Sequence, residues 1–467
     1  MKILLVSPNH RQYVFTPNLG LGYLSAALEK NGHETAVLIC NKERMSYKKF
    51  RKYILTSNFD IVGFQVFSLD LNYTKQYLQV VKDISPGIIT VVGGPHPSGD
   101  PAGTMHYLEN ADFGFKGESE SAFSKLVDCL AHSSEIAGKL DRDILRQIPG
   151  LIWRNDKNIE VNNPQYTENL DDLAFPSWNL MKPREFARSP HGGFAKRFPV
   201  APIIITRGCP YKCTFCAAGS ICGENVRSRT ISNVMAEIRY LHTDFKVREI
   251  HIHDDNFAFH RKLFMDFCKE LIKSKMDICW ACPSGIRLDN LNEEMVYLMQ
   301  QSGCHSVSVG IEFGTDRLLE LTKKQLSLET IKEKIALIKK NNIQITGFFI
   351  LGYPQETQEE INKTIQFSLN LDIDRAQFAI FTPLPGSETW DILQKQDKVK
   401  NINFDRMFFY DVAFNPSRMP GKMLKKLQKR AYLRFYLRWP IIRKILRALT
   451  SLSQARHLLG RAFYVLR

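Results

Sequence analysis

The first 131 residues alternate short apolar runs with longer segments in which apolar residues recur every three or four positions. The short runs predict buried strands, and the longer segments predict amphipathic helices. Repeated strand–helix units predict a parallel, doubly wound α/β sheet of the Rossmann type, with helices on both faces. Ligands of such sheets bind beyond the carboxyl ends of the strands. The predicted strands are 3–6, 35–39, 61–66, 88–92 and 113–115, and the predicted helices are 21–30, 45–55, 72–83 and 119–130.

A second alternation begins at residue 202, and its six strand–helix units predict a partial (β/α)6 barrel. Barrel active sites lie on the loops at the C-terminal ends of the strands. The residues between the two halves are irregular, with a small hairpin at 153–159 and a proline-rich stretch. We therefore expect a first domain at 1–131, a connector at 132–200, a barrel at 201–400 and a helical C-terminal region at 401–467. The predicted barrel strands are 202–206, 249–253, 278–281, 306–311, 344–351 and 377–381, with helices such as 232–242 and 328–340 between them.

The formal charge of +15 is placed very unevenly along the 467 residues. Residues 412–467 hold 14 Lys or Arg and no Asp or Glu, so the remainder holds 49 basic and 48 acidic residues. A nucleic-acid surface on the body is therefore not indicated. No uncharged apolar run approaches the roughly 20 residues that span a bilayer, and the run at 1–6 is too short for a signal-peptide core. We expect a cytoplasmic protein.

Three cysteines, Cys209, Cys213 and Cys216, follow the first predicted barrel strand with the spacing Cys-x3-Cys-x2-Cys. Thiolates are the ligands that iron–sulfur clusters select. Three of them leave one iron of a four-iron cluster with an open position, as in a catalytic metal site. Structural zinc sites usually add a second Cys pair, which argues against zinc. The triplet resembles the signature of the radical S-adenosylmethionine (SAM) superfamily.

Polar and glycine residues follow the other predicted barrel strands, and together with the triplet they resemble a radical SAM domain over about residues 200–390. The resemblance implies that the cysteines hold a [4Fe-4S] cluster whose open iron binds SAM. Electron transfer would then cleave SAM to methionine and a 5′-deoxyadenosyl radical. Glu312 matches the Gly-x-Glu position that contacts SAM, and Arg287 is equally expected to be a structural ion-pair member. The implied cofactor-binding residues of this half are Glu312, Asp254, Asp255, Gly310, Gly352 and Pro354.

Glycine-rich turns follow strands of the first domain, which suits close backbone approach to a large flat ligand. Their order resembles the cobalamin-binding domain that precedes many radical SAM domains, and the implied cofactor-binding residues are Gly22, Gly93, Gly94 and His96. Many cobalamin proteins carry Asp-x-His-x-x-Gly, whose His ligates cobalt. His96 has Gly99 three residues later but lacks the Asp. Either cobalt has no protein ligand from below, which we favour, or the domain has lost cobalamin.

The remaining cysteines and two histidines give weaker signals. Cys279 and Cys282 have Cys-x2-Cys spacing but lie within a predicted strand, without a second pair. Free cysteines are commonly buried apolar residues, and we expect that role for these and for Cys304. His251 and His253 point to the same side of their strand, as core or as substrate-pocket residues.

The basic tail contains Arg430, Arg434 and Arg438 on one helix face, next to bulky aromatic residues. A basic helix of this kind suits an anionic membrane surface. The alternative is a helix that docks on the barrel with its arginines facing water.

The resemblance as a whole implies a cobalamin-dependent radical SAM enzyme, a C-methyltransferase acting on an unactivated carbon. The implied partners are a small-molecule substrate, such as a lipid or tetrapyrrole, and a reductant such as flavodoxin or ferredoxin. The tail residues themselves add the inner membrane surface as an expected contact. An anaerobic oxidative cyclase of the Mg-protoporphyrin monomethyl ester type is one alternative, and a membrane-bound, non-enzymatic iron–sulfur interaction protein is another. A tRNA methylthiotransferase is a further alternative, but it needs three more cysteines in its N-terminal domain. Residues 1–199 contain only Cys40 and Cys129, which nearly excludes this class of enzyme.

Overall fold

The protein, seen in a computed structural model, is described over residues 1–9, 16–132, 140–186, 195–399, 402–415, 417 and 419–448. Its described residues form two compact units, and each combines separate stretches of the chain. The first unit contains Met1–Lys182, Phe215–Glu224 and Pro383–Asp405. The second contains Pro183–Thr214, Asn225–Thr382 and the described part of Arg406–Arg467.

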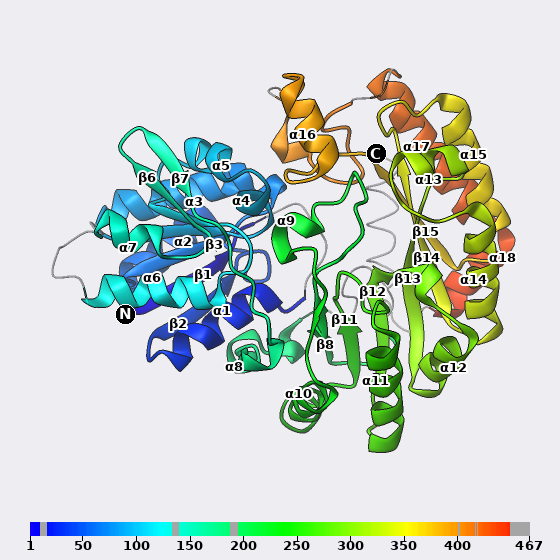
Figure 1. Cartoon of the computed structure of the whole chain (residues 1–467), viewed down its shortest axis with the longest axis horizontal. Coiled ribbons are helices and arrows are strands. Elements are labelled where there is room, and N and C mark those ends of the chain that lie inside the picture. The colour runs from blue at the N-terminus through cyan, green and yellow to red at the C-terminus, as the bar shows by residue number, and fades with distance from the viewer. Residues whose placement is uncertain are drawn as a thin grey trace. The chain divides into compact units, whose positions relative to one another are not determined.

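The first unit is built on a seven-stranded sheet with the order β2-β1-β3-β4-β5-β6-β7 (Figure 1). The five strands of the predicted Rossmann-like sheet are present and pair in parallel, which confirms the predicted doubly wound core. The predicted hairpin is also present, and it extends this sheet because β6 pairs antiparallel with β5. The strands are β1 (Lys2–Ser7), β2 (Glu34–Ile39), β3 (Ile61–Gln65), β4 (Ile89–Gly93), β5 (Phe113–Phe115), β6 (Leu151–Asn155) and β7 (Asn158–Val161).

Helices cover both faces of this sheet because its central strands are apolar on both sides. Ile3 and Leu5 of β1 pack into one core with α1 and α6, and Leu4 and Val6 pack into the other with α2, α3 and α5. Asn18 begins the first helix, where its side chain accepts a hydrogen bond from the backbone N–H of Leu21. The predicted helices correspond to α1 (Leu19–Lys30), α2 (Tyr47–Ser57), α3 (Leu71–Ile84) and α6 (Glu120–His132).

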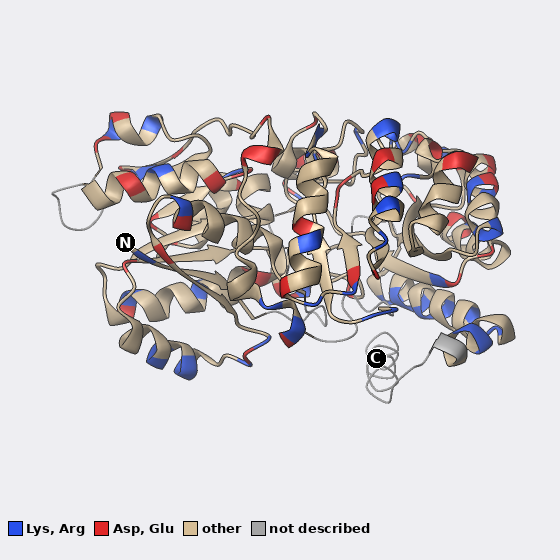
Figure 2. Cartoon of the chain, turned by 90° about the horizontal axis from the view of Figure 1, so that it is seen from below, with Lys and Arg blue, Asp and Glu red and all other residues tan. Residues whose placement is uncertain are grey.

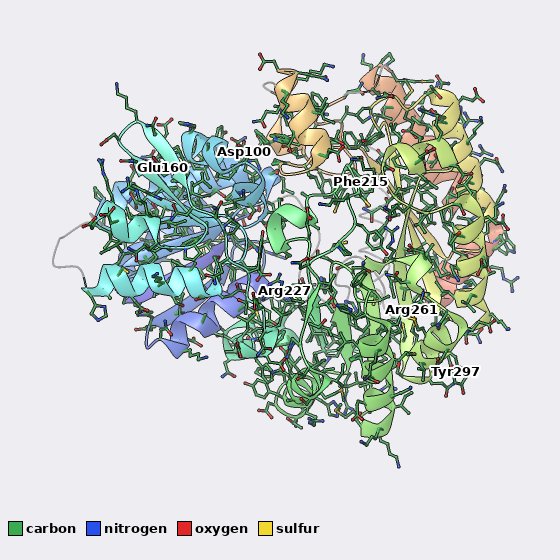
Figure 3. All side chains as sticks on the ribbon, in the orientation of Figure 1. Asp100, Glu160, Phe215, Arg227, Arg261 and Tyr297 are labelled. Carbon is green, nitrogen blue, oxygen red and sulfur yellow. The ribbon has the colours of Figure 1, made fainter. Side chains whose placement is uncertain are left out.

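Short helices that the apolar pattern did not predict complete the first unit. Asp100 stands between α4 and α5 (Figure 3), and its carboxylate accepts from the Gly103 N–H to cap α5. Within the same unit, Gly99 approaches the backbone of Pro385 so closely that a Cβ would overlap it. The additional helices are α4 (Pro95–Gly99), α5 (Pro101–Tyr107), α7 (Arg142–Arg146), α8 (Trp178–Met181), α9 (Ala218–Cys222) and α16 (Glu388–Lys395).

The second unit is an open barrel of six parallel strands in the order β15-β14-β13-β12-β11-β8, with helices along its outer side (Figure 1). This is the predicted partial barrel. Its strands are β8 (Val200–Ile203), β11 (Glu249–Ile252), β12 (Cys279–Ile286), β13 (Cys304–Glu312), β14 (Gln344–Leu351) and β15 (Arg375–Ile380). Its helices are α10 (Ile231–Asp244), α11 (Arg261–Ser274), α12 (Glu293–Gln301), α13 (Asp316–Leu321), α14 (Leu328–Lys340) and α15 (Gln358–Asn370).

The first barrel strand ends earlier than the sequence predicts. Strand β8 stops at Ile203, and Thr206–Arg207 forms a separate short strand, β9, which pairs with β10 (Arg227–Ser228). The backbone N–H groups of Ile205 and Thr206 bond to the Asp254 carboxylate and not to the sheet. A side chain therefore replaces the strand pairing directly before the cysteine triplet.

A C-terminal helix, α17 (Gly421–Tyr436), covers the open edge of the barrel at β15. The Tyr436 hydroxyl accepts from Ala376 N and donates to Ala376 O at 3.2 and 2.9 Å. The Tyr432 hydroxyl accepts from Phe378 N at 3.0 Å, and Gln428 Nε2 donates to Phe378 O at 2.8 Å. Side chains thus satisfy the backbone groups that an edge strand would otherwise expose.

Helix α18 (Trp439–Ala448) follows α17, and the two helices carry Lys and Arg without Asp or Glu (Figure 2). The alternative of a basic helix docked on the barrel holds for α17, where Arg434 donates to Gln366 Oε1. Arg438 donates to Leu369 O, but it lies beyond the end of α17 and not on its face as predicted. Residues 449–467 of the predicted tail lie outside the described residues. Among the described residues, no helix is both long enough and apolar enough to cross a bilayer.

Candidate functional site

None of the three cysteines of the triplet is fully buried. Cys216 is exposed and Cys209 and Cys213 are partly buried. All ten cysteines are free thiols, and five of those outside the triplet are buried: Cys40, Cys268, Cys279, Cys282 and Cys304. Free cysteines usually pack in the interior as small apolar residues, as we expected for Cys279, Cys282 and Cys304. Three accessible thiols on one short loop therefore fit an iron–sulfur cluster.

Two neighbouring aspartates hold the start of the cysteine loop. The buried Asp254 carboxylate accepts from Ile205 N, Thr206 N and Thr206 Oγ1 at 2.7–2.8 Å. Burial raises the pKa of Asp254 to about 7, although these hydrogen bonds lower it. Asp255 accepts from Gly208 N at 3.3 Å, and Gly208 has a left-handed backbone with φ of +96°. The predicted cofactor-binding residues Asp254 and Asp255 thus both bond to the backbone that precedes Cys209.

A stacked arginine holds the middle of the loop. Tyr211 lies between Cys209 and Cys213 in the sequence. The Arg287 guanidinium lies 3.4 Å from the centroid of the Tyr211 ring. The same guanidinium pairs with Asp289 at 2.8 Å and donates to Lys324 O. The ion pair considered in the sequence is therefore present, and it fixes the cation against the cysteine loop.

The end of the loop is joined to the segments that follow two other strands, β13 and β14. Thr214 N donates to Thr322 O at 3.1 Å, and the Thr214 hydroxyl lies 2.7 Å from the Tyr353 hydroxyl. Cys213 Sγ is 3.9 Å from Lys323 O. The loop is consequently held by residues that follow β11, β12, β13 and β14, at the end of the barrel where chemistry is expected.

Glu312 ends β13 and forms a buried ion pair. Its Oε1 lies 2.9 Å from Lys324 Nζ, and the two side chains are only 11% and 12% exposed. Burial lowers the pKa of Lys324, but Glu312 and Cys213 outweigh that effect and raise it. A Cβ at Gly310 would lie 2.8 Å from Lys324 Nζ and closer still to Glu312 Oε1. The missing side chain in Gly-x-Glu is therefore what leaves room for this pair.

Lys324 was not predicted as a site residue. It lies in the segment between α13 and α14 and not directly after a strand, so its position carried no signal in the sequence.

The turn after β14 is organised by its own glutamate. The buried Glu356 carboxyl group accepts from Gly352 N and Tyr353 N at 2.5 and 3.1 Å, around Pro354. Gly352 has φ of +85°, and a Cβ there would meet Leu424 of α17 at 2.6 Å. The predicted residues Gly352 and Pro354 therefore belong to a tight turn that α17 packs against.

The predicted glycines of the first unit have different surroundings. Gly94 follows β4 with φ of +105°, and a Cβ there would lie 3.2 Å from the backbone of Val66. A Cβ at Gly93 would make only an ordinary contact with Phe115. Gly22 faces Met181 and Pro176, and a Cβ at this position would lie 2.5 Å from Met181 Cε. The absence of a side chain at Gly22 therefore permits α8 to pack on α1.

His96 is buried in α4 and is not presented as a ligand. It is 2% exposed, its Nδ1 lies 2.8 Å from the Ser68 hydroxyl, and its ring packs edge-on against Phe404. Burial lowers its pKa to about 3, so the imidazole is neutral. This arrangement fits a corrinoid site in which His96 does not coordinate cobalt.

Comparison with protein families and known proteins agrees with this geometry. Residues 203–368 match the model of the radical SAM superfamily, and residues 12–127 match that of the B12 binding domain. The chain is 30% identical over 411 residues to an uncharacterized methyltransferase of Pyrococcus horikoshii, covering 86% of this chain and 85% of the relative. It is 27% identical over 433 residues to the anaerobic magnesium-protoporphyrin IX monomethyl ester cyclase of Rubrivivax gelatinosus, covering 90% and 74%.

A solved structure shows the same fold. It is the radical SAM methyltransferase TsrM from Kitasatospora setae, with cobalamin and a [4Fe-4S] cluster bound. The TM-score is 0.70 at 17% identity, and the match covers 90% of this chain and 83% of that one.

Proposed function

The chain belongs to the radical SAM superfamily, among the members with a B12-binding domain, and on that premise we propose that it methylates an unactivated carbon of a small apolar substrate, a lipid or a tetrapyrrole. It is a radical SAM enzyme of the cobalamin-dependent methyltransferase family, and its cofactors are a [4Fe-4S] cluster, SAM and cobalamin. The observation that carries the proposal is the accessible cysteine loop, held by residues following four barrel strands.

Each polar residue around the loop has a task in this proposal. Cys209, Cys213 and Cys216 hold the cluster, and Asp254, Asp255 and Arg287 position their loop. The Glu312 carboxylate accepts from the ammonium group of SAM, and Lys324 orients that carboxylate. When bound, the cluster supplies the electron that cleaves SAM and cobalamin carries the methyl group to be transferred.

The test uses SAM with a trideuterated methyl group. The protein, reconstituted without oxygen with cluster and cobalamin, is incubated with candidate lipids and tetrapyrroles, and the products are measured by mass spectrometry. A product that carries the trideuteromethyl group supports methyl transfer, and a Cys213→Ala variant should give none. A product that is modified but unlabelled would refute methyl transfer and support a cyclase, as the similarity to the Rubrivivax enzyme allows.

An external reductant completes the reaction, and we propose flavodoxin or ferredoxin in the cytoplasm. The exposed Cys216 supports electron entry at the cysteine loop, and ten free thiols suit a reducing compartment. Reduced flavodoxin or ferredoxin should therefore support SAM cleavage in an assay that contains no dithionite. Failure of both proteins to support cleavage would contradict the proposal.

We assign a peripheral membrane contact to α18 and the two residues before it. Leu437, Trp439 and Leu446 are 60–69% exposed next to Arg443, whereas Lys444 pairs with Asp372 and Asp374. Arg434 and Arg438 also bond to the barrel. A Trp439→Ser, Leu446→Ser variant should sediment less with anionic vesicles, and its residual binding should weaken with salt. Tyr297 on α12 is 56% exposed (Figure 3), so Tyr297→Ser is the matched control. Equal sedimentation of all three proteins would contradict the membrane contact.

A further inference from the structure

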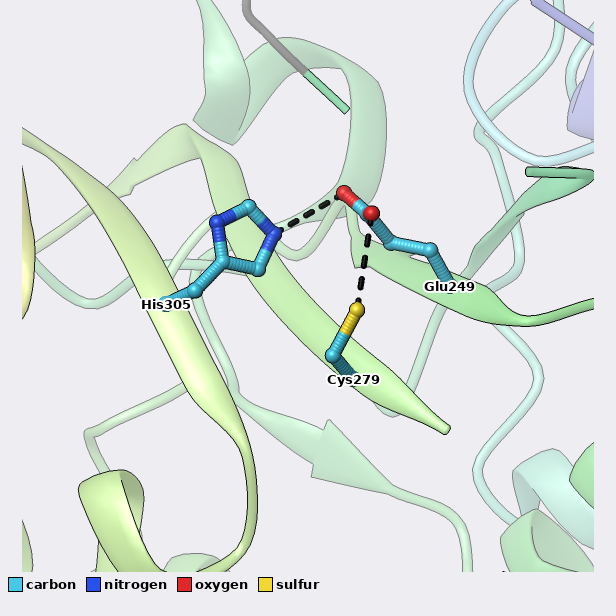
Figure 4. A group of neighbouring side chains, drawn as sticks. All are labelled: Glu249, Cys279 and His305. Atoms are coloured by element: carbon cyan, nitrogen blue, oxygen red, sulfur yellow. Dashed lines mark hydrogen bonds and ion pairs between the residues drawn. The ribbon is translucent and has the colours of Figure 1, made fainter. Parts of the chain in front are cut away.

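A cluster of metal-binding side chains lies at the end of the barrel opposite to the cysteine loop. Glu249 and Cys279 are the first residues of β11 and β12, and His305 is the second residue of β13. Their ligand atoms all lie within 4.8 Å of one another (Figure 4). The cysteine loop follows the C-terminal end of β8, whereas these residues begin their strands, so the two sites are separate.

The Glu249 carboxylate is the centre of the cluster and is fully buried. Its Oε1 accepts from His251 Nε2 at 2.8 Å and from His305 Nε2 at 2.9 Å. Its Oε2 accepts from Arg197 N at 2.6 Å and lies 3.5 Å from Cys279 Sγ. The cluster is therefore a buried anion surrounded by donors that can also ligate a metal.

The strand register brings these side chains together. Glu249 and Cys279 are direct partners across the parallel β11–β12 pair. Cys304 pairs with Trp280 and Ser306 with Ala281, so His305 is the extra residue of a bulge in β13. Bulges redirect side chains and are common next to functional sites. Here the bulge turns the His305 imidazole toward Glu249 (Figure 4).

We propose that Glu249, Cys279 and His305 bind a zinc ion that joins the N-terminal ends of three barrel strands. Zinc takes sulfur, nitrogen and carboxylate oxygen ligands in tetrahedral geometry with bonds of about 2.0–2.3 Å, which brings its donors to roughly 3.3–3.8 Å from one another. The donors here are already within 4.8 Å, and side-chain rotation closes the difference. His251 or a water molecule takes the fourth position. A zinc ion would also neutralise the buried carboxylate and stabilise the folded barrel.

Metal analysis of the full-length protein tests this site independently of the cluster. Purified without oxygen from zinc-supplemented cells, the wild type should hold about one zinc and about four irons per chain. Cys279→Ser and His305→Gln should each lower the zinc content at least about tenfold and retain the iron. Cys268→Ala removes a buried thiol of α11 outside the cluster and should keep the zinc. Cys213→Ala should lose the iron and keep the zinc.

A second measurement covers the case in which a ligand variant fails to fold. The Cys213→Ala protein, which lacks the absorption of the iron–sulfur cluster, is titrated with Co²⁺. A cysteine-to-cobalt charge-transfer band should appear in this protein. The band should be absent from the double variant that carries both Cys213→Ala and Cys279→Ser. A wild-type protein that holds no more zinc than Cys279→Ser, or a Co²⁺ titration without that band, would overturn the proposal.

Discussion

Replacing Gly310 by alanine should weaken SAM binding without unfolding the barrel. The added methyl group would lie 2.8 Å from Lys324 Nζ and closer to Glu312 Oε1, so it would displace both groups. Both are the far ends of flexible side chains, and Gly310 lies within β13 and is not among the positive-φ glycines. The substitution therefore alters the direction of the carboxylate and leaves the backbone unstrained.

The size of the effect follows from the hydrogen bond that the Glu312 carboxylate would accept from the ammonium group of SAM. A hydrogen bond to a charged group contributes about 1.5–3 kcal/mol, and each 1.4 kcal/mol is a factor of ten in affinity. The dissociation constant of SAM should thus rise roughly 10- to 100-fold. The free energy of unfolding should fall by about 1 kcal/mol, the typical value for a single substitution.

The assay is equilibrium dialysis of radiolabelled SAM against the reconstituted protein. Gly347→Ala in the neighbouring strand is the matched control, because its methyl group would lie 3.0 Å from core carbons of Ile311, Ile373 and Phe349. That variant should lose about 1–3 kcal/mol of stability by overpacking and still bind SAM normally. Normal SAM affinity in the Gly310→Ala protein would refute the role of the Glu312–Lys324 pair.

Three further predictions concern the cluster, the corrinoid and pH. Cys213→Ala should abolish iron binding and SAM cleavage, measured by iron content and 5′-deoxyadenosine formation; a full cluster in this variant would contradict the assignment. The protein with hydroxocobalamin should show a spectrum without histidine ligation, unchanged in His96→Gln; loss of a nitrogen signal from the Co(II) resonance spectrum in that variant would contradict this. Burial raises the pKa of Glu356 from 4.5 to about 8, so the folded state keeps a proton that the unfolded chain releases. Its contribution to stability is full below about pH 4.5 and is lost as pH rises toward 8. The free energy of unfolding, measured with urea at several pH values, should fall less steeply over this range for Glu356→Gln than for the wild type. Parallel pH dependences of the two proteins would contradict the reasoning.

The sequence predicted the strands and the cysteine loop because both depend on local patterns. Apolar runs such as 61–66 are buried on both faces, and this is visible in the composition of the run itself. The triplet is visible because its three thiols lie within one short loop. Strand β8 ended before the predicted residue 206 because Asp254, some fifty residues later, takes its backbone donors. A local pattern contains no information on that partner.

The roles of individual site residues needed the three-dimensional structure. Gly22 suggested close approach of a ligand, yet its missing side chain makes room for Met181, which comes from a distant segment. Lys324 lies beside Glu312 only because the chain returns after α13. Glu249, Cys279 and His305 are separated by 30 and 26 positions, and the bulge that turns His305 cannot be read from composition.

The position of α17 has a consequence for the order in which the protein is made. The open barrel is complete in sequence at Ile380, but the backbone groups of Ala376 and Phe378 find their tyrosine and glutamine partners only about fifty residues later. During synthesis, which proceeds from the N-terminus, the β15 edge is therefore available to any other extended chain. Helix α17, which closes this edge, is synthesised only after the whole barrel, so a chain that stops before Gly421 would keep a barrel open to strand addition.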